Sequence, residues 1–182
     1  MIRTPLAALS ILQVDETFHA RFSCKGREYE YWVYNSRFRH PLLDGRAYWV
    51  KTEINRELLE ENARQLLGRH LFDSFTPPMS LQGKSSEREI LRVEVLNSDE
   101  YSGLMKIRFH GSGFLHNMVR IMSGTLIDIG RGRLKDRNMK QIIEARDRNA
   151  AGITLPPYGL YFIKAYYADY PEIENLYSGT RY

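Results

Sequence analysis

The segment from Gly113 to Ile127 constrains this chain most, because its only charged residue is Arg120. The spacing predicts a helix over Phe114–Ile129, with an apolar face spanning about 100° of arc. That face is made of Leu115, Met118, Val119, Met122, Leu126 and Ile129. The opposite face is nearly as apolar and carries His116, Arg120, Ser123 and Ile127. We therefore expect this helix to be buried on both sides.

Arg120 then needs a partner for its charge. A guanidinium cannot lose its proton in a protein, and an unpaired buried charge costs several kcal/mol. We expect Arg120 to bind a carboxylate or a phosphate. The alternative is that its side chain reaches solvent or pairs with a structural acid.

A second informative segment runs from Arg21 to Trp32. Alternation and aromatic content predict a strand over Arg27–Tyr34. Its aromatic rings could stack on bases while Arg21, Lys25 and Arg27 hold phosphates. The alternative is an aromatic sheet face that only fills the core.

The remaining elements mix strands and helices without a regular alternation. Strands are expected at 47–50 and 160–167, a hairpin at 90–96 and 104–109, and helices at 55–67, which Gly68 would end, and 137–146, which Asp136 would cap. This pattern predicts an α+β fold: an antiparallel-rich mixed sheet with helices packed on one face. At 182 residues, we expect one domain over 1–182.

Composition and charge exclude several classes. With 43% hydrophobic and 26% charged residues, the chain is not of a disordered type, and no apolar run reaches the roughly 20 residues of a membrane helix. The single cysteine excludes a disulfide framework within the chain and favours a reducing cytoplasm. The five histidines lack metal-ligand spacing, so no metal is expected.

The net charge of +4 is distributed unevenly. Residues 21–48 carry six basic and three acidic side chains, and residues 103–148 carry ten basic and four acidic ones. A polyanion is a reasonable partner if the fold brings these two blocks together, and ordinary solvated surface is the alternative.

Ordered motifs along the chain resemble the tRNA pseudouridine synthase A family. The resemblance runs from about Leu9 to Tyr167. Its motifs are Phe18-His19-Ala20-Arg21-Phe22-Ser23 with Tyr29-x-Tyr31, Leu67-Gly68 with Phe72-x-Ser74-Phe75, Phe114-Leu115-His116-Asn117-Met118-Val119-Arg120 with Gly124, and Gly159-Leu160-Tyr161.

The resemblance implies an isomerase that converts uridine to pseudouridine in the tRNA anticodon stem-loop. The base must first leave the stack, after which an aspartate opens the glycosidic bond and the uracil rejoins through carbon-5. It implies no cofactor and no metal, with tRNA as partner and a homodimer as the assembly. Tyr29 would stack on the flipped base and is a candidate for removing the carbon-5 proton. Arg120 would pair with the catalytic aspartate, and Arg21, Lys25, Arg27 and His116 are candidate substrate-binding residues.

One departure from the family pattern concerns the nucleophile. The family aspartate lies in an Arg-Thr-Asp-Ala-Gly motif upstream of Phe18, and this sequence has only Arg3-Thr4-Pro5 there. Asp15 and Asp73 fall where the family nucleophile is not found. The chain thus resembles the C-terminal part of the enzyme and is expected to be inactive alone. The alternatives are a non-catalytic RNA-binding module and a dimer subunit.

Overall fold

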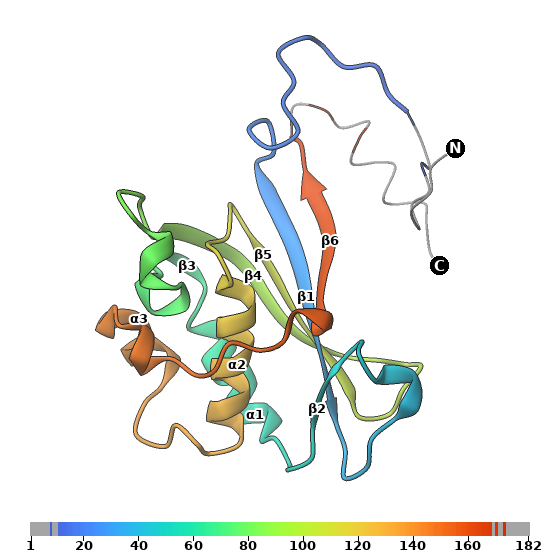
Figure 1. Cartoon of the computed structure of the whole chain (residues 1–182), viewed down its shortest axis with the longest axis vertical. Helices are drawn as coiled ribbons and strands as arrows, with labels where there is room; N and C mark the ends of the chain where they lie inside the picture. Colours follow the sequence, from blue (N-terminus) through green and yellow to red (C-terminus); the bar gives the residue numbers. More distant parts are fainter. Residues whose placement is uncertain (1–7, 9–10, 169, 171–172, 174–182) are drawn as a thin grey trace.

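A computed structural model describes residues 8, 11–168, 170 and 173 of the chain (Figure 1). Within 11–168 the chain forms one six-stranded sheet and three α-helices. The strands are β1 (Gly26–Asn35), β2 (Tyr48–Val50), β3 (Gly68–Leu71), β4 (Glu87–Asn97), β5 (Leu104–Gly111) and β6 (Leu160–Tyr166). The helices are α1 (Arg56–Arg64), α2 (Met118–Gly130) and α3 (Met139–Ala145). Short 3-10 turns occur at 41–43, 73–75, 78–80, 148–150 and 157–159.

The long strand β1 organises the sheet. The strand order is β2-β1-β5-β4-β3, and β6 also pairs with β1. β5 lies antiparallel along one edge of β1, while its other edge holds β6 antiparallel and β2 parallel. Since only the β1–β2 pair is parallel, the predicted antiparallel-rich α+β sheet is confirmed.

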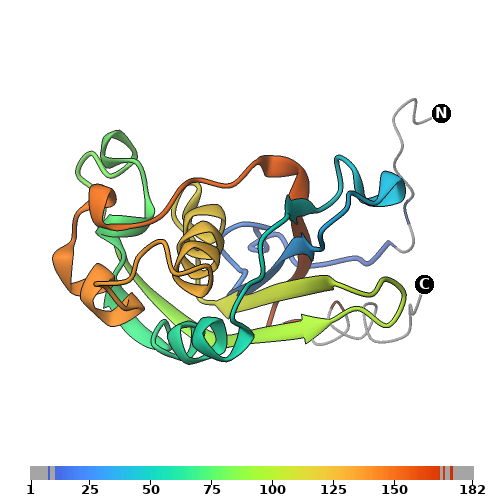
Figure 2. The same cartoon turned by 90° about the horizontal axis from the view of Figure 1, so that it is seen from below.

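Helix α2 crosses one face of the sheet, as Figure 2 shows. All of its residues except Arg120 are buried, which confirms the expectation from its composition. Its sheet side packs in one core with residues such as Tyr31, Ile107 and Phe109, and α1 and α3 contribute to the same core. The segment that leads to β6 covers its other side, since Thr125 Oγ1 accepts from the Gly152 amide at 2.9 Å.

The predicted start of this helix was wrong by four residues. The sequence pattern placed it at Phe114, whereas α2 begins at Met118. Asn117 has a left-handed backbone with φ of 59°, so a right-handed helix cannot extend back through it. Phe114 and His116 therefore lie in the loop before α2.

Two other expectations also differ from the structure. The short strand β3 was not predicted, and α1 ends at Arg64, so Gly68 (φ 97°) opens β3 instead of stopping a helix. Asn138 caps α3 in place of Asp136, because its side chain accepts from the Gln141 amide while the Gln141 side chain accepts from the Asn138 amide.

An ionic network fixes β1 from the face that α2 does not cover. Glu28 and Glu30 are buried there, at 4% and 3% exposure. Arg108 lies 2.6 Å from Glu30, and Arg92 lies 2.9 Å from Glu28. Tyr166 donates a hydrogen bond to Glu28 at 2.7 Å. Strands β4, β5 and β6 are thereby all linked to β1, and these links hold β1 in place beneath α2.

A small residue is required at Gly124, where α2 meets the covering segment. A β-carbon on Gly124 would lie 2.0 Å from the Ile153 carbonyl oxygen, so the backbone itself would have to move. We expect Gly124→Ala to lower the free energy of unfolding by about 1–3 kcal/mol, measured by chemical denaturation. The neighbouring Ser123→Ala is the control: its buried hydroxyl has no partner among the described residues, so its loss should cost little. Equal effects of the two changes would contradict this account.

Candidate functional site

Tyr29 lies on the face of β1 that carries Tyr31 and packs toward α2. Its half-buried ring meets Phe114 and Phe162 edge-on, with ring centroids 5.3 Å away in each case. Burial raises the pKa of the Tyr29 hydroxyl, and the charge of Arg27 opposes this only in part. Within the described chain the hydroxyl has no hydrogen-bond partner, so the ring and hydroxyl stand at the edge of the core without a fixed polar contact.

A β-bulge determines which side chain lies against Tyr29. Lys164 is opposite Glu28 and Phe162 is opposite Tyr29, so Ile163 is the extra residue on β6. Bulges redirect side chains and are frequent beside functional sites. Here the bulge places Phe162 on the Tyr29 ring while leaving it 55% exposed.

Arg120 lies in the first turn of α2 and is half-buried. Its Nε donates to the Leu155 carbonyl at 2.6 Å, and its Nη1 donates to Asn117 Oδ1 at 2.8 Å. No described carboxylate lies within 4.0 Å of it, so its partners among the described residues include neither the expected acid nor a structural one. The printed partners of the guanidinium are thus neutral acceptors only.

Tyr31 connects Arg120 with the Tyr29 region. Tyr31 follows Tyr29 on the same strand face, and its hydroxyl donates to the Pro156 carbonyl at 2.7 Å. Burial strongly raises the Tyr31 pKa, and the nearby positive charge of Arg120 acts to lower it. Because Pro156 follows Leu155, one short segment accepts hydrogen bonds from both Tyr31 and Arg120. The two candidate catalytic residues therefore belong to one region of the fold.

The buried carboxylates of the described chain already have partners elsewhere. Glu28 and Glu30 are held in the ionic network on the opposite sheet face. Asp128, at the other end of α2, lies 3.5 Å from Arg133. The two acids weighed from the sequence are also occupied: Asp73 accepts from Ser86 and Arg146, and Asp15 accepts from Thr17 and Tyr170. None of these acids balances the charge of Arg120.

The predicted substrate cations fall into two groups. Arg27 donates to the carbonyls of Cys24, Ser112 and Arg21 at 3.0, 2.9 and 2.6 Å, so its guanidinium holds the loops at the end of the sheet together. Arg21, Lys25 and His116 are exposed. The backbone carbonyl of His116 accepts from Thr76 Oγ1 at 3.1 Å, which anchors its loop and leaves the imidazole at the surface.

Sequence reasoning missed two side chains of this region, Phe114 and Phe162. Phe114 was predicted to be the first residue of a helix, and only the left-handed Asn117 shows that it belongs to a loop. The contact of Phe162 depends on a bulge that leaves no trace in the residue pattern.

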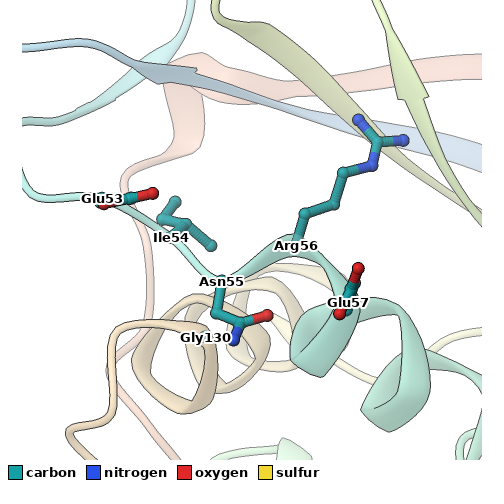
Figure 3. Close-up of a pocket in the computed structure, with 6 residues that line it drawn as sticks. All are labelled: Glu53, Ile54, Asn55, Arg56, Glu57 and Gly130. Atoms are coloured by element: carbon teal, nitrogen blue, oxygen red, sulfur yellow. The ribbon is translucent and has the colours of Figure 1, made fainter.

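An open hollow of about 620 Å³ lies at the opposite end of α2 (Figure 3). It is lined by Glu53, Ile54, Asn55, Arg56, Glu57 and Gly130. Two of its polar side chains are engaged: Asn55 accepts from the Leu58 amide at 2.9 Å, and Arg56 lies 2.7 Å from Glu60. Ten residues of α2, about 15 Å of helix, separate its lining residue Gly130 from Arg120, so it is a distinct surface feature.

The described residues contain no cluster of three or more His, Cys, Asp or Glu side chains that could hold a metal ion. The same part of the chain holds no helix that is long and apolar enough to cross a membrane.

Comparison with known proteins supplies the family. The profile of the family described as tRNA pseudouridine synthase matches residues 62–168, more than half of the chain. The chain belongs to the tRNA pseudouridine synthase family. Proteins named tRNA pseudouridine synthase A are 47% identical in Leptospira interrogans, 46% in Leptospira biflexa and 41% in Acetivibrio thermocellus, over 95%, 96% and 85% of this chain. The matches span 84%, 65% and 62% of those relatives, so the chain covers less than two thirds of the latter two.

Within this family fold, Asn117 has two separable functions. Its left-handed backbone prevents α2 from extending further toward the N-terminus, and its side chain accepts a hydrogen bond from Arg120. Asn117→Ala should lower the free energy of unfolding by about 1–2 kcal/mol, because alanine is strained in that conformation. Asn117→Gly should keep most of the stability, since glycine accepts positive φ, while losing the bond to Arg120. Chemical denaturation of both variants checks this, and equal losses would show that the backbone conformation is not limiting.

Proposed function

We propose that this chain takes part in the isomerisation of uridine to pseudouridine in tRNA, and that it contributes Tyr29 and Arg120 to the active site. The observation that carries the proposal is the charge of Arg120. It is half-buried in the first turn of α2 and has two neutral acceptors but no described carboxylate within 4.0 Å. A guanidinium of this kind fits the task of holding a catalytic carboxylate in its ionised form. Family membership and the names of the relatives support the same reaction.

The proposed reaction assigns each group a step. The uridine leaves the base stack, and its uracil stacks on Tyr29. The carboxylate that Arg120 orients opens the bond between C1′ and N1 of the nucleotide. The uracil turns, a new bond forms between C1′ and C5, and the C5 proton is released while N1 gains one. Product and substrate have the same atoms, so no redox partner is required.

We infer that the carboxylate comes from a segment with an Arg-Thr-Asp-Ala-Gly motif, which the 182 residues do not contain. The 182 residues alone should therefore bind tRNA without producing pseudouridine. Liquid chromatography of digested tRNA measures the product. Turnover by the purified chain would show that one of its own acids is the nucleophile.

Supplying the motif-bearing segment, fused or in trans, allows a direct test of Arg120. Arg120→Ala should then lower turnover by about a hundredfold or more, because the carboxylate loses its charge partner, while tRNA affinity stays close to that of the unchanged protein. Arg131→Ala, at the far end of α2, is the matched control and should retain turnover. Parallel loss of turnover and tRNA affinity in Arg120→Ala would instead make Arg120 a structural or phosphate-binding residue.

Tyr29 can be tested separately. Burial raises its pKa, so the hydroxyl stays protonated at neutral pH, and we expect the ring to matter more than the hydroxyl. In the same reconstituted enzyme, Tyr29→Phe should keep turnover within about tenfold, and Tyr29→Ala should lose stacking worth about 1–3 kcal/mol. A hundredfold loss in Tyr29→Phe would assign the hydroxyl a role in removing the C5 proton.

We further propose a homodimer acting in the cytoplasm, the reducing compartment that the single cysteine favours. The absence of a described carboxylate at Arg120 also favours a second candidate function, a non-catalytic RNA-binding module. Salt-dependent tRNA binding without turnover, even when the motif-bearing segment is supplied, would support that candidate over the enzyme.

A further inference from the structure

We propose that Arg88 binds a phosphate of the RNA strand that carries the target nucleotide, a role that builds on the proposed tRNA substrate. Arg88 lies at the start of β4, two residues before the buried Ile90 and on the same strand face. That face is the one that packs against α2 and carries Tyr29. Arg88 and Tyr29 are therefore on the same side of the sheet.

The loop after β5 brings Arg88 beside the Tyr29 cluster. β5 ends at Gly111, and a β-carbon on Gly113 would lie 3.7 Å from Cδ and Nε of Arg88. One residue further, Phe114 meets the ring of Tyr29. β4 and β1 flank β5, so they are roughly 10 Å apart. A nucleotide bridges such a separation when its base lies on one strand and its phosphate on the other.

The charge of Arg88 is unbalanced in the described structure. Its Nη1 donates to the backbone carbonyls of Ser85 and Glu87, and no described carboxylate lies within 4.0 Å of it. The flanking acids Glu87 and Glu89 are paired with Arg69, at 3.8 and 3.5 Å. Burial of the Arg88 side chain also lowers its pKa, the direction expected for a cation with no anion beside it.

This geometry distinguishes Arg88 from Arg27 on the other side of the same loop. Arg27 donates to three backbone carbonyls from its two terminal nitrogens. Arg88 uses one terminal nitrogen, so its Nε and Nη2 have no acceptor among the described residues. A phosphate, which offers several strong acceptors, matches a guanidinium with two neighbouring donors unused.

Salt-dependent binding of a fluorescent, unmodified tRNA transcript tests the proposal on the full chain. Arg88→Gln keeps a donor for the local carbonyls but loses the charge, so it should weaken binding about tenfold and reduce the salt slope by about one unit. Arg88→Lys should restore the slope, which separates loss of charge from misfolding. Arg69→Ala, whose guanidinium is already paired, is the matched control and should leave the slope unchanged.

Neutralised phosphates test the contact itself. A stem-loop RNA with methylphosphonate linkages beside the target uridine should bind the unchanged chain less tightly and bind Arg88→Gln with no further loss. An unchanged salt slope in Arg88→Gln, or an equal methylphosphonate effect in both proteins, would overturn the proposal.

The outcomes also separate this proposal from the proposed function. Failure of the unchanged chain to bind tRNA would overturn both. A reduced slope in Arg88→Gln, with no turnover by the enzyme completed with the motif-bearing segment, would support the phosphate contact and remove the isomerase. Turnover by the completed enzyme, together with an unchanged salt slope in Arg88→Gln, would support the isomerase and remove the phosphate contact.

Discussion

The hydrogen bond from Arg120 to the Leu155 carbonyl, at 2.6 Å, is the interaction on which the arrangement of this region depends. It joins the first turn of α2 to the segment that leads into β6. The same guanidinium donates to Asn117, whose left-handed backbone determines where the helix begins. One side chain thus links the first turn of α2 with the covering segment. That segment leads into β6, whose own pairing with β1 places Phe162 on Tyr29.

The two faces of β1 separate two kinds of chemistry. Glu28 and Glu30 point to the face that α2 does not cover, where arginines neutralise them. Tyr29 and Tyr31 point to the other face, which meets the core around α2. These two glutamates are therefore paired with other arginines, on the sheet face opposite Arg120. Its charge remains available on the face where a stacked base and a catalytic carboxylate would have to meet.

Much of the fold could be predicted because its elements carry strong local patterns. The β4–β5 hairpin follows from alternation around a polar turn, and the burial of α2 follows from a segment with one charge. The four residues of β3 are too few to show a period, so that strand was not predicted. The start of α2 depends on one backbone conformation at Asn117, and no apolar pattern encodes it.

The site was harder to predict because its contacts join distant parts of the chain. The sequence indicated that Arg120 needs a partner, but Leu155 lies 35 residues away and acts through its backbone, which has no residue signature. Arg27 is a candidate phosphate ligand, and no residue pattern showed that it also donates to carbonyls of the surrounding loops. Tyr29 was placed correctly on a strand, yet its contact with Phe162 depends on a bulge. Tertiary geometry, not residue type, decided each of these points.

The central claim is that the half-buried Arg120 is the site of a carboxylate that the described residues do not supply. A crystal structure of the 182 residues joined to a segment with the Arg-Thr-Asp-Ala-Gly motif tests it most directly. The account predicts that the aspartate lies within about 4 Å of the Arg120 guanidinium, on the side that faces Tyr29. An aspartate bound elsewhere, with Arg120 still contacting only Leu155 and Asn117, would contradict it.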